Sequence, residues 1–170
     1  MTDPLATEWL AAIERPTVIS ALESIYATIA REVEQRGPAC WASGRCCNFE
    51  KAGHQLFVTG LEAAYTVSRL SDRPAPGSLP QLTDRAAPLT SGSLASAVAA
   101  GTCPFLSGHL CGAHAMRPLG CRVYFCDRSA QEWQQDLSER MLALVRTVHN
   151  EHDIEYRYGE WRSILSRFIA

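Results

Sequence analysis

Positive charge is not in excess in this sequence. Its 170 residues hold 16 lysines and arginines against 18 aspartates and glutamates, which gives a formal net charge of −2. A protein that binds duplex nucleic acid usually needs a clustered basic face to neutralise the phosphates. We therefore expect no nucleic-acid partner.

Long hydrophobic runs are also missing. No apolar stretch reaches the roughly 18 residues that a membrane helix needs. The first residues, MTDPLATEWLAAIERP, lack the basic start and apolar centre of a secretory signal. We expect a cytoplasmic protein with no membrane partner. Because thiols stay reduced in the cytoplasm, we expect the cysteines to serve metal binding or catalysis rather than disulfide bonds.

The common nucleotide and cofactor motifs are absent as well. The sequence has no G-x-G-x-x-G after a strand, no P-loop and no C-x3-C-x2-C of radical enzymes. No cysteine stands apart beside a recognisable base, which argues against a single catalytic thiol. If the chain is an enzyme, another kind of site has to carry its chemistry.

Hydrophobic side chains at helical spacing predict a mostly α fold. Hydrophobic residues make up 46% of the chain, which is enough for one ordinary core. We expect a single small helical domain over residues 1–170. It would have N-terminal helices over 4–35, a cysteine-bearing region over 40–126 and C-terminal helices over 130–169. Irregular cysteine-bearing loops in the middle region are expected to form a metal site.

Local signals divide these regions further. The spacing predicts helices over residues 4–14, 17–35, 93–100, 130–150 and 158–169. Pro16 should end or kink the first of them, while Thr59 and Glu62 form a capping box that starts another helix within 56–70. Residues 72–92 contain four prolines and are expected to form an exposed connection. The most regular apolar stripe is Trp133, Leu137, Met141, Leu144 and Val148.

The seven cysteines form two groups with the spacings C-x5-C-C and C-x7-C-x9-C-x4-C. The candidate metal ligands are Cys40, Cys46, Cys47, Cys103, Cys111, Cys121 and Cys126. Several thiolates together bind soft or borderline metals, but neither group is the repeated C-x2-C pair of a zinc ribbon. The spacing therefore favours a metal without saying which one. The adjacent Cys46 and Cys47 could both be ligands, or one could be a buried thiol.

Three arginines lie close to these cysteines in the sequence. Arg45 precedes Cys46, while Arg117 and Arg122 flank Cys121. A fixed positive charge lowers the pKa of a nearby thiol and offsets the negative charge of a metal–thiolate centre. We therefore expect Arg117 and Arg122 to contribute to cofactor binding. Each of the three could instead be a solvated or salt-bridged surface residue.

Taken together, these motifs resemble a known family. They are C-x2-S-G-x-C-C at residues 40–47, CPFL at 103–106, Cys111, and RPLGCRVYFC at 117–126. The combination is similar to the CxxCxxCC, or YkgJ-type, cysteine-cluster proteins, which are described as a zinc- or iron-chelating domain. Some members are labelled iron–sulfur proteins, and the flagellin lysine methylase is a relative.

The resemblance implies a set of metal ligands and also shows where the chain departs from it. The implied ligands are Cys40, Cys46, Cys47, Cys103, Cys111 and Cys121. Ser43 stands where the family has its second cysteine, and a serine oxygen is a poor ligand for a soft metal. Cys126 could make up the number. His114 replaces an aromatic residue of the relatives and could serve as a substitute ligand. The other histidines, His54, His109, His149 and His152, are expected in loops or on helix surfaces.

Three functions remain open from the sequence. The first is a metal-binding protein that holds iron, as an iron–sulfur cluster, or zinc, and acts with an unidentified protein or redox partner. Six or seven thiolates exceed one tetrahedral site, which implies two metals or one polynuclear cluster; iron is slightly favoured. The second is a structural zinc domain that binds a protein partner. The third is a methyl-transfer or redox enzyme related to the flagellin lysine methylase.

Overall fold

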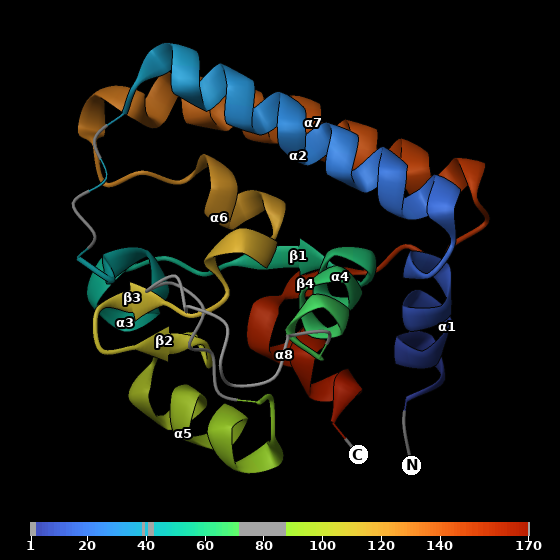
Figure 1. Cartoon of the computed structure of the whole chain (residues 1–170). Coiled ribbons are helices and arrows are strands. Elements are labelled where there is room, and N and C mark those ends of the chain that lie inside the picture. Colours follow the sequence, from blue (N-terminus) through green and yellow to red (C-terminus); the bar gives the residue numbers. More distant parts are fainter. Residues whose placement is uncertain (1–2, 39, 41–42, 72–87, 170) are drawn as a thin grey trace, which may run out of the picture.

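The computed structural model describes residues 3–38, 40, 43–71 and 88–169. Most of the predicted connection over 72–92 lies outside these residues. Helices dominate the described part of the chain, so the prediction of a mostly α fold is confirmed (Figure 1).

The elements follow one another as helices with a few short strands between them. The helices are α1 (Pro4–Ile13), α2 (Pro16–Arg36), α3 (Phe49–Ala52), α4 (Gly60–Ser71), α5 (Ser91–Ala100), α6 (Leu119–Val123), α7 (Gln131–Glu151) and α8 (Trp161–Leu165). The strands are β1 (Phe57–Thr59), β2 (Leu106–Ser107), β3 (Leu110–Cys111) and β4 (Tyr158–Glu160). Short 3-10 turns cover Arg45–Cys47, His114–Met116, Arg128–Ala130 and Ser166–Phe168.

The two N-terminal helices lie where the sequence predicts them, and α1 ends shortly before Pro16, as expected. Pro16 also has a second role, at the start of the next helix. It is the first residue of α2, where a missing N–H costs nothing because the first turn has no helical acceptor for it. Gly37 ends α2 in the left-handed conformation, with φ of 55°.

The long helices α2 and α7 run side by side in opposite directions and cover one side of the molecule (Figure 1). Arg140 of α7 joins them through an ion pair with Glu32 at 2.7 Å. The predicted stripe on α7 needs one correction, because Leu144 is 44% exposed whereas Val145 is fully buried. At 3.6 residues per turn the buried arc is centred near Met141, so Leu144 falls at its edge.

Strand β4 replaces the first turn of the helix predicted over 158–169. It pairs antiparallel with β1, placing Phe57 opposite Glu160, and the N–H of Trp161 donates to the carbonyl of Leu56 at 2.8 Å. The helical spacing of the apolar residues does not reveal this partner, which lies far away in the sequence. Helix α8 then begins at Trp161.

Helix α4 is the centre of the fold, and the predicted capping box at its start is confirmed. The N–H and hydroxyl of Thr59 both donate to Glu62 Oε2 at 2.9 Å, and Glu62 N–H donates back to Thr59 Oγ1 at 3.3 Å. A Cβ at Gly60 would overlap the ring of Trp9, so glycine allows α1 to pack directly on α4. Among the described residues, no helix is both long and apolar enough to cross a membrane.

Candidate metal centre

Cysteines from both sequence groups line one cavity of about 180 Å³. They are Cys40, Cys46, Cys47, Cys111, Cys121 and Cys126. All seven cysteines of the chain are free thiols, and the seventh, Cys103, contacts the side chain of Cys47. We call this space the thiol cavity. Ser43, the residue at the family's second cysteine position, also lines it.

A tight turn brings the first cysteine group against the second. Gly44, with φ of 69°, leads into the 3-10 turn Arg45–Cys47. A Cβ on Gly44 would lie 2.8 Å from the Cα of His109, closer than real Cβ atoms approach a backbone. Glycine is therefore required where this turn crosses the β2–β3 hairpin that carries Cys111.

Cys47 is the common partner of three other cysteines. Its buried thiol hydrogen-bonds with the side chains of Cys103, Cys111 and Cys46. Its backbone carbonyl also accepts from the N–H of Cys103 at 2.8 Å. The two sequence groups are thus joined through both backbone and side chain at one residue.

Cys103 is fixed from the other side by the C-terminal helix. Trp161, at the start of α8, is buried and donates its indole N–H to Cys103 Sγ at 3.4 Å. A hydrogen bond to a cysteine sulfur tunes the potential of any metal that the cysteine holds. This role of Trp161 could not be predicted from the sequence, because a lone tryptophan in an apolar stripe gives no sign of such a contact.

Cys121 is positioned by the capping residue of α4. Glu62 Oε1 accepts from the N–H of Leu119 at 2.8 Å, and Leu119 is the first residue of α6, the short helix that carries Cys121. Thr66 Oγ1 adds a hydrogen bond to the carbonyl of Met116 at 2.8 Å, just before this helix. The central helix therefore holds the third cysteine-bearing segment through buried polar contacts.

The hydrogen bonds around Cys47 shift the pKa values of the cysteines in opposite directions. Hydrogen bonding with Cys47 lowers the pKa of Cys46 to about 6 and that of Cys111 to about 7, and the positive charge of Arg117 acts in the same direction. The partners of Cys47, first Cys103 and then Cys111 and Cys46, raise the pKa of its own thiol. Burial raises the pKa of Cys121. Cys47 has a single S–H proton, so its hydrogen bond stabilises the thiolate of Cys46 or of Cys111, one at a time.

Arg117, which the sequence predicts to contribute to cofactor binding, lies at the cavity. It lines the thiol cavity and is held by hydrogen bonds from its guanidinium to the carbonyls of His114 at 2.9 Å and Cys121 at 3.4 Å. Because these partners are carbonyls rather than carboxylates, its positive charge remains available to offset the thiolates.

Arg122 lies away from the lining of the cavity. Its guanidinium is 3.9 Å from the centre of the Tyr26 ring on α2, and it donates to the carbonyls of Arg117 at 2.6 Å and Ala115 at 3.0 Å. These contacts connect α6 to α2 and hold the loop before Cys121. Arg122 therefore supports the site from behind, through Arg117 and the backbone.

Two histidines, His109 and His114, line the thiol cavity from exposed positions. His54 does not belong to the lining of the thiol cavity. Burial lowers the pKa of its imidazole, and a hydrogen bond with the backbone of Cys46 opposes that shift. The expectation that His149 is on a helix surface is wrong. It is 1% exposed, and its Nδ1 pairs with the carbonyl of Ile154 at 3.3 Å.

Whether these residues fit a metal depends on donor chemistry and on arrangement. Thiols from three segments, with histidines at the edge, are donors that soft and borderline metals prefer. Within the described ranges, however, no three cysteine, histidine or acidic side chains are arranged so that they could hold a metal ion. The thiols face Cys47 as hydrogen-bonding partners. Metal binding therefore requires them to turn to a shared centre and lose protons.

Comparison with protein families, with curated proteins and with solved structures finds no match to this chain. The resemblance to the YkgJ-type proteins consequently stays a prediction that rests on the quoted motifs. Chemical measurements on the thiol cavity itself provide its test.

Proposed function

We propose that the chain is a metal-binding protein that holds iron, as an iron–sulfur cluster, or zinc through the cysteines of the thiol cavity. One observation carries the proposal: cysteines from three separate segments, far apart in sequence, gather at one small cavity. Cysteines used only as small hydrophobic residues would have no reason to converge in this way.

The residues divide into an inner and an outer set. Cys46, Cys47, Cys111 and Cys121 would provide the inner thiolates, since they line the cavity away from full exposure. The outer positions are the exposed Cys40 and the edge histidines, and the partly buried Cys126 would be a further ligand. An iron–sulfur cluster would supply one-electron redox chemistry, whereas zinc would join the loops. In either case Arg117 would offset the negative charge of the thiolates, and Trp161 would hold Cys103 in place.

A structural role for zinc is the second candidate, and burial supports it. Cys47 and Cys103 belong to the main hydrophobic core, 5% and 7% exposed. A metal bound there would connect the cysteine-bearing loops to the centre of the fold, and its binding energy would become folding energy. The methyl-transfer reading has no support of this kind from the described residues.

Elemental analysis and a visible absorption spectrum of protein purified without oxygen test the proposal. Iron with acid-labile sulfide and a brown colour would support a cluster. Zinc without colour would support the structural role. Protein with neither metal, and with seven titratable thiols, would refute both.

A further inference from the structure

Cys47 and Cys111 come from segments far apart in the sequence, and their side chains are in contact. Cys47 lies on the 3-10 turn Arg45–Cys47 and Cys111 on β3, and their thiols are hydrogen-bonding partners. A metal needs several donors that point to one centre, an arrangement not found among the described residues. A disulfide needs only two sulfurs in contact. The conformation of the thiol cavity is therefore closer to a disulfide than to a metal centre.

The other two cysteines that contact Cys47 are less suited to this bond. Cys46 is adjacent in sequence, and consecutive Cα atoms lie about 3.8 Å apart, closer than the usual span of about 4.4–6.8 Å across a disulfide. Cys103 is 7% exposed, its sulfur accepts the indole N–H of Trp161, and it is not among the described residues that line the thiol cavity. Cys111 is left as the partner, because it lines the cavity and is partly exposed.

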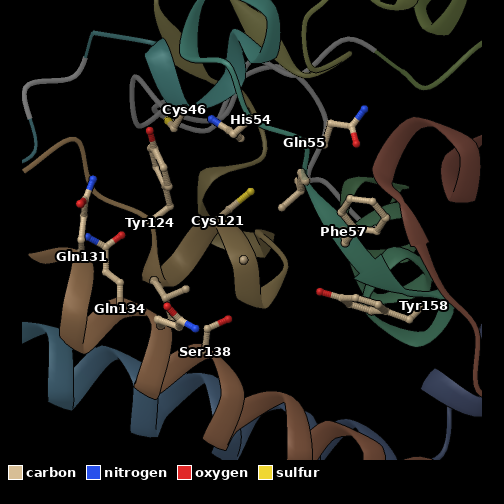
Figure 2. Close-up of a pocket in the computed structure, with 14 residues that line it drawn as sticks. Cys46, His54, Gln55, Phe57, Cys121, Tyr124, Gln131, Gln134, Ser138 and Tyr158 are labelled. Carbon is tan, nitrogen blue, oxygen red and sulfur yellow. The ribbon is translucent and has the colours of Figure 1, made fainter. Parts of the chain in front are cut away.

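The thiol cavity gives a small oxidant access to this pair, since Cys47 and Cys111 both line it. A second cavity, of about 370 Å³, lies between β1, α6 and α7 (Figure 2). Cys46 and Cys121 belong to the lining of both cavities, whereas neither Cys47 nor Cys111 is among the described residues that line the second. An oxidant therefore reaches the pair from the thiol cavity.

From these contacts we infer that the thiol cavity is an oxidation site, in which hydrogen peroxide joins Cys47 and Cys111 in a disulfide. Peroxide transfers one oxygen to the Cys111 sulfur, so that its O–O bond breaks and a sulfenic acid and water are formed. The Cys47 sulfur then attacks the Cys111 sulfur and breaks the S–O bond, and the hydroxyl leaves with the Cys47 proton as a second water. Two thiols are oxidised by two electrons in total, and the peroxide is reduced to water.

The disulfide regulates metal binding at the same cavity. It removes Cys47 and Cys111 from the inner thiolates and leaves Cys46 and Cys121, which are too few for a closed tetrahedral site. A thiol reductant restores the pair by thiol–disulfide exchange. This regulatory step rests on the proposed function, whereas formation of the disulfide does not.

Mapping of the thiols tests the disulfide. The full chain, treated with a chelator to remove metal, is exposed to one equivalent of hydrogen peroxide, and its free thiols are blocked with iodoacetamide. After reduction, the released thiols are labelled with N-ethylmaleimide, and tandem mass spectra locate this label. Of the seven thiols, we expect Cys47 and Cys111 to carry it. Absence of a labelled pair, or a pair that lacks either residue, would overturn the inference.

Two variants test the partner and the route. Cys111→Ser removes the partner of Cys47, so peroxide should form a disulfide at Cys47 at least about tenfold more slowly. Ser138→Met fills the second cavity from α7 (Figure 2) and should form the Cys47–Cys111 disulfide at the wild-type rate. A wild-type rate at Cys47 in Cys111→Ser would overturn the inference, and so would loss of the disulfide in Ser138→Met.

Zinc binding tests the regulatory step. The affinity for Zn²⁺ is measured by competition with a chromophoric chelator for the reduced, the oxidised and the re-reduced chain. We expect oxidation to weaken zinc binding at least about tenfold and dithiothreitol to restore it. Equal affinity of the oxidised and reduced chains would refute the regulation. A reduced chain that binds no zinc would count against the proposed function, and the thiol map, made without metal, decides the disulfide by itself.

Discussion

Cys47 is the residue on which the thiol cavity depends most, because three other cysteine side chains and the backbone of Cys103 contact it. Cys40, by contrast, is exposed at the edge of the same space. Serine is close in size to cysteine but is a poor ligand for soft metals. Comparing Cys47→Ser with Cys40→Ser therefore tests whether the central thiol contributes more to metal binding than the peripheral one.

We expect Cys47→Ser to lose most of the bound metal and to unfold more easily, by about 1–3 kcal/mol, since a hydroxyl costs more than a thiol to bury in the hydrophobic core that contains Cys47. Cys40→Ser should lose less metal and retain near-normal stability. Metal per protein chain and urea denaturation measure the two effects. If Cys47→Ser keeps its full metal content, the thiols around it do not form the binding site.

His149 gives the protein a specific sensitivity to acid. Burial lowers its pKa in the folded state below the ordinary value of 6.5, while the carbonyls of Ile154 and Glu155 oppose the shift. Below about pH 6.5 the unfolded chain therefore binds a proton at His149 that the folded chain does not bind. By linkage, stability is complete above that pH and falls as the pH drops, by up to about 1.4 kcal/mol per pH unit from this group.

His149→Gln should thus be less stable than wild type at pH 7.5 and should show a shallower loss of stability between pH 7 and 5. Urea denaturation at a series of pH values measures the slope. Val148→Ala, at a neighbouring buried position, controls for lower stability alone and should keep the wild-type slope. Equal slopes for His149→Gln and wild type would show that another group causes the acid sensitivity.

At the scale of elements, α4 organises both the core and the site. Glu62 caps α4 through Thr59 and holds the start of α6 through Leu119. The Glu62 side chain accepts three hydrogen bonds, all from N–H or O–H donors. A carboxylate can accept with both of its oxygens, whereas the amide of a glutamine has only one oxygen that can accept. Burial raises the pKa of Glu62, and the hydrogen bonds from Thr59 and Leu119 oppose that shift.

Glu62→Gln should lower the free energy of unfolding by about 1–3 kcal/mol, because its NH2 group meets a buried donor. Glu34→Gln, on the exposed face of α2, should change it by less than about 0.5 kcal/mol. Chemical denaturation of both variants gives the comparison. Similar stabilities for the two variants would mean that the capping contacts contribute little.

The elements that the sequence predicts well are those that depend on local signals. The helices around Leu22 and Met141 follow from their apolar spacing, and the capping box at Thr59 follows from two side chains three residues apart. The strand at Tyr158 does not, because its partner β1 lies about a hundred residues earlier and short strands leave almost no periodic signal. The burial of His149 is missed for a similar reason, since it depends on the turn that follows α7.

At the scale of the whole molecule, the fold brings the two cysteine groups together at the thiol cavity. The motifs indicate which thiols matter, and Cys40, Cys46 and Cys121 do share one cavity. The crossing at Gly44, the support from Arg122 and the contact from Trp161 depend on tertiary packing. For that reason the sequence could indicate the composition of the site but not its arrangement.

Because the thiol cavity joins three distant segments, removal of a bound metal should destabilise the whole domain. A ligand that binds only the folded state stabilises it by mass action, and for a chain of this size each 1 kcal/mol corresponds to about 2–4 °C in Tm. We expect metal-stripped protein to melt several degrees lower, and metal added back to restore the original Tm. Identical melting curves with and without metal would mean that the centre adds nothing to the fold.

The contact between Trp161 and Cys103 also sets an order of events during synthesis. The two residues are 58 positions apart, so at about 5–20 residues per second the ribosome adds Cys103 roughly 3–12 s before Trp161. Until then α8 cannot cover that sulfur. In this interval the Cys103 sulfur would be most accessible to a metal delivered to the growing chain, and also to oxidants.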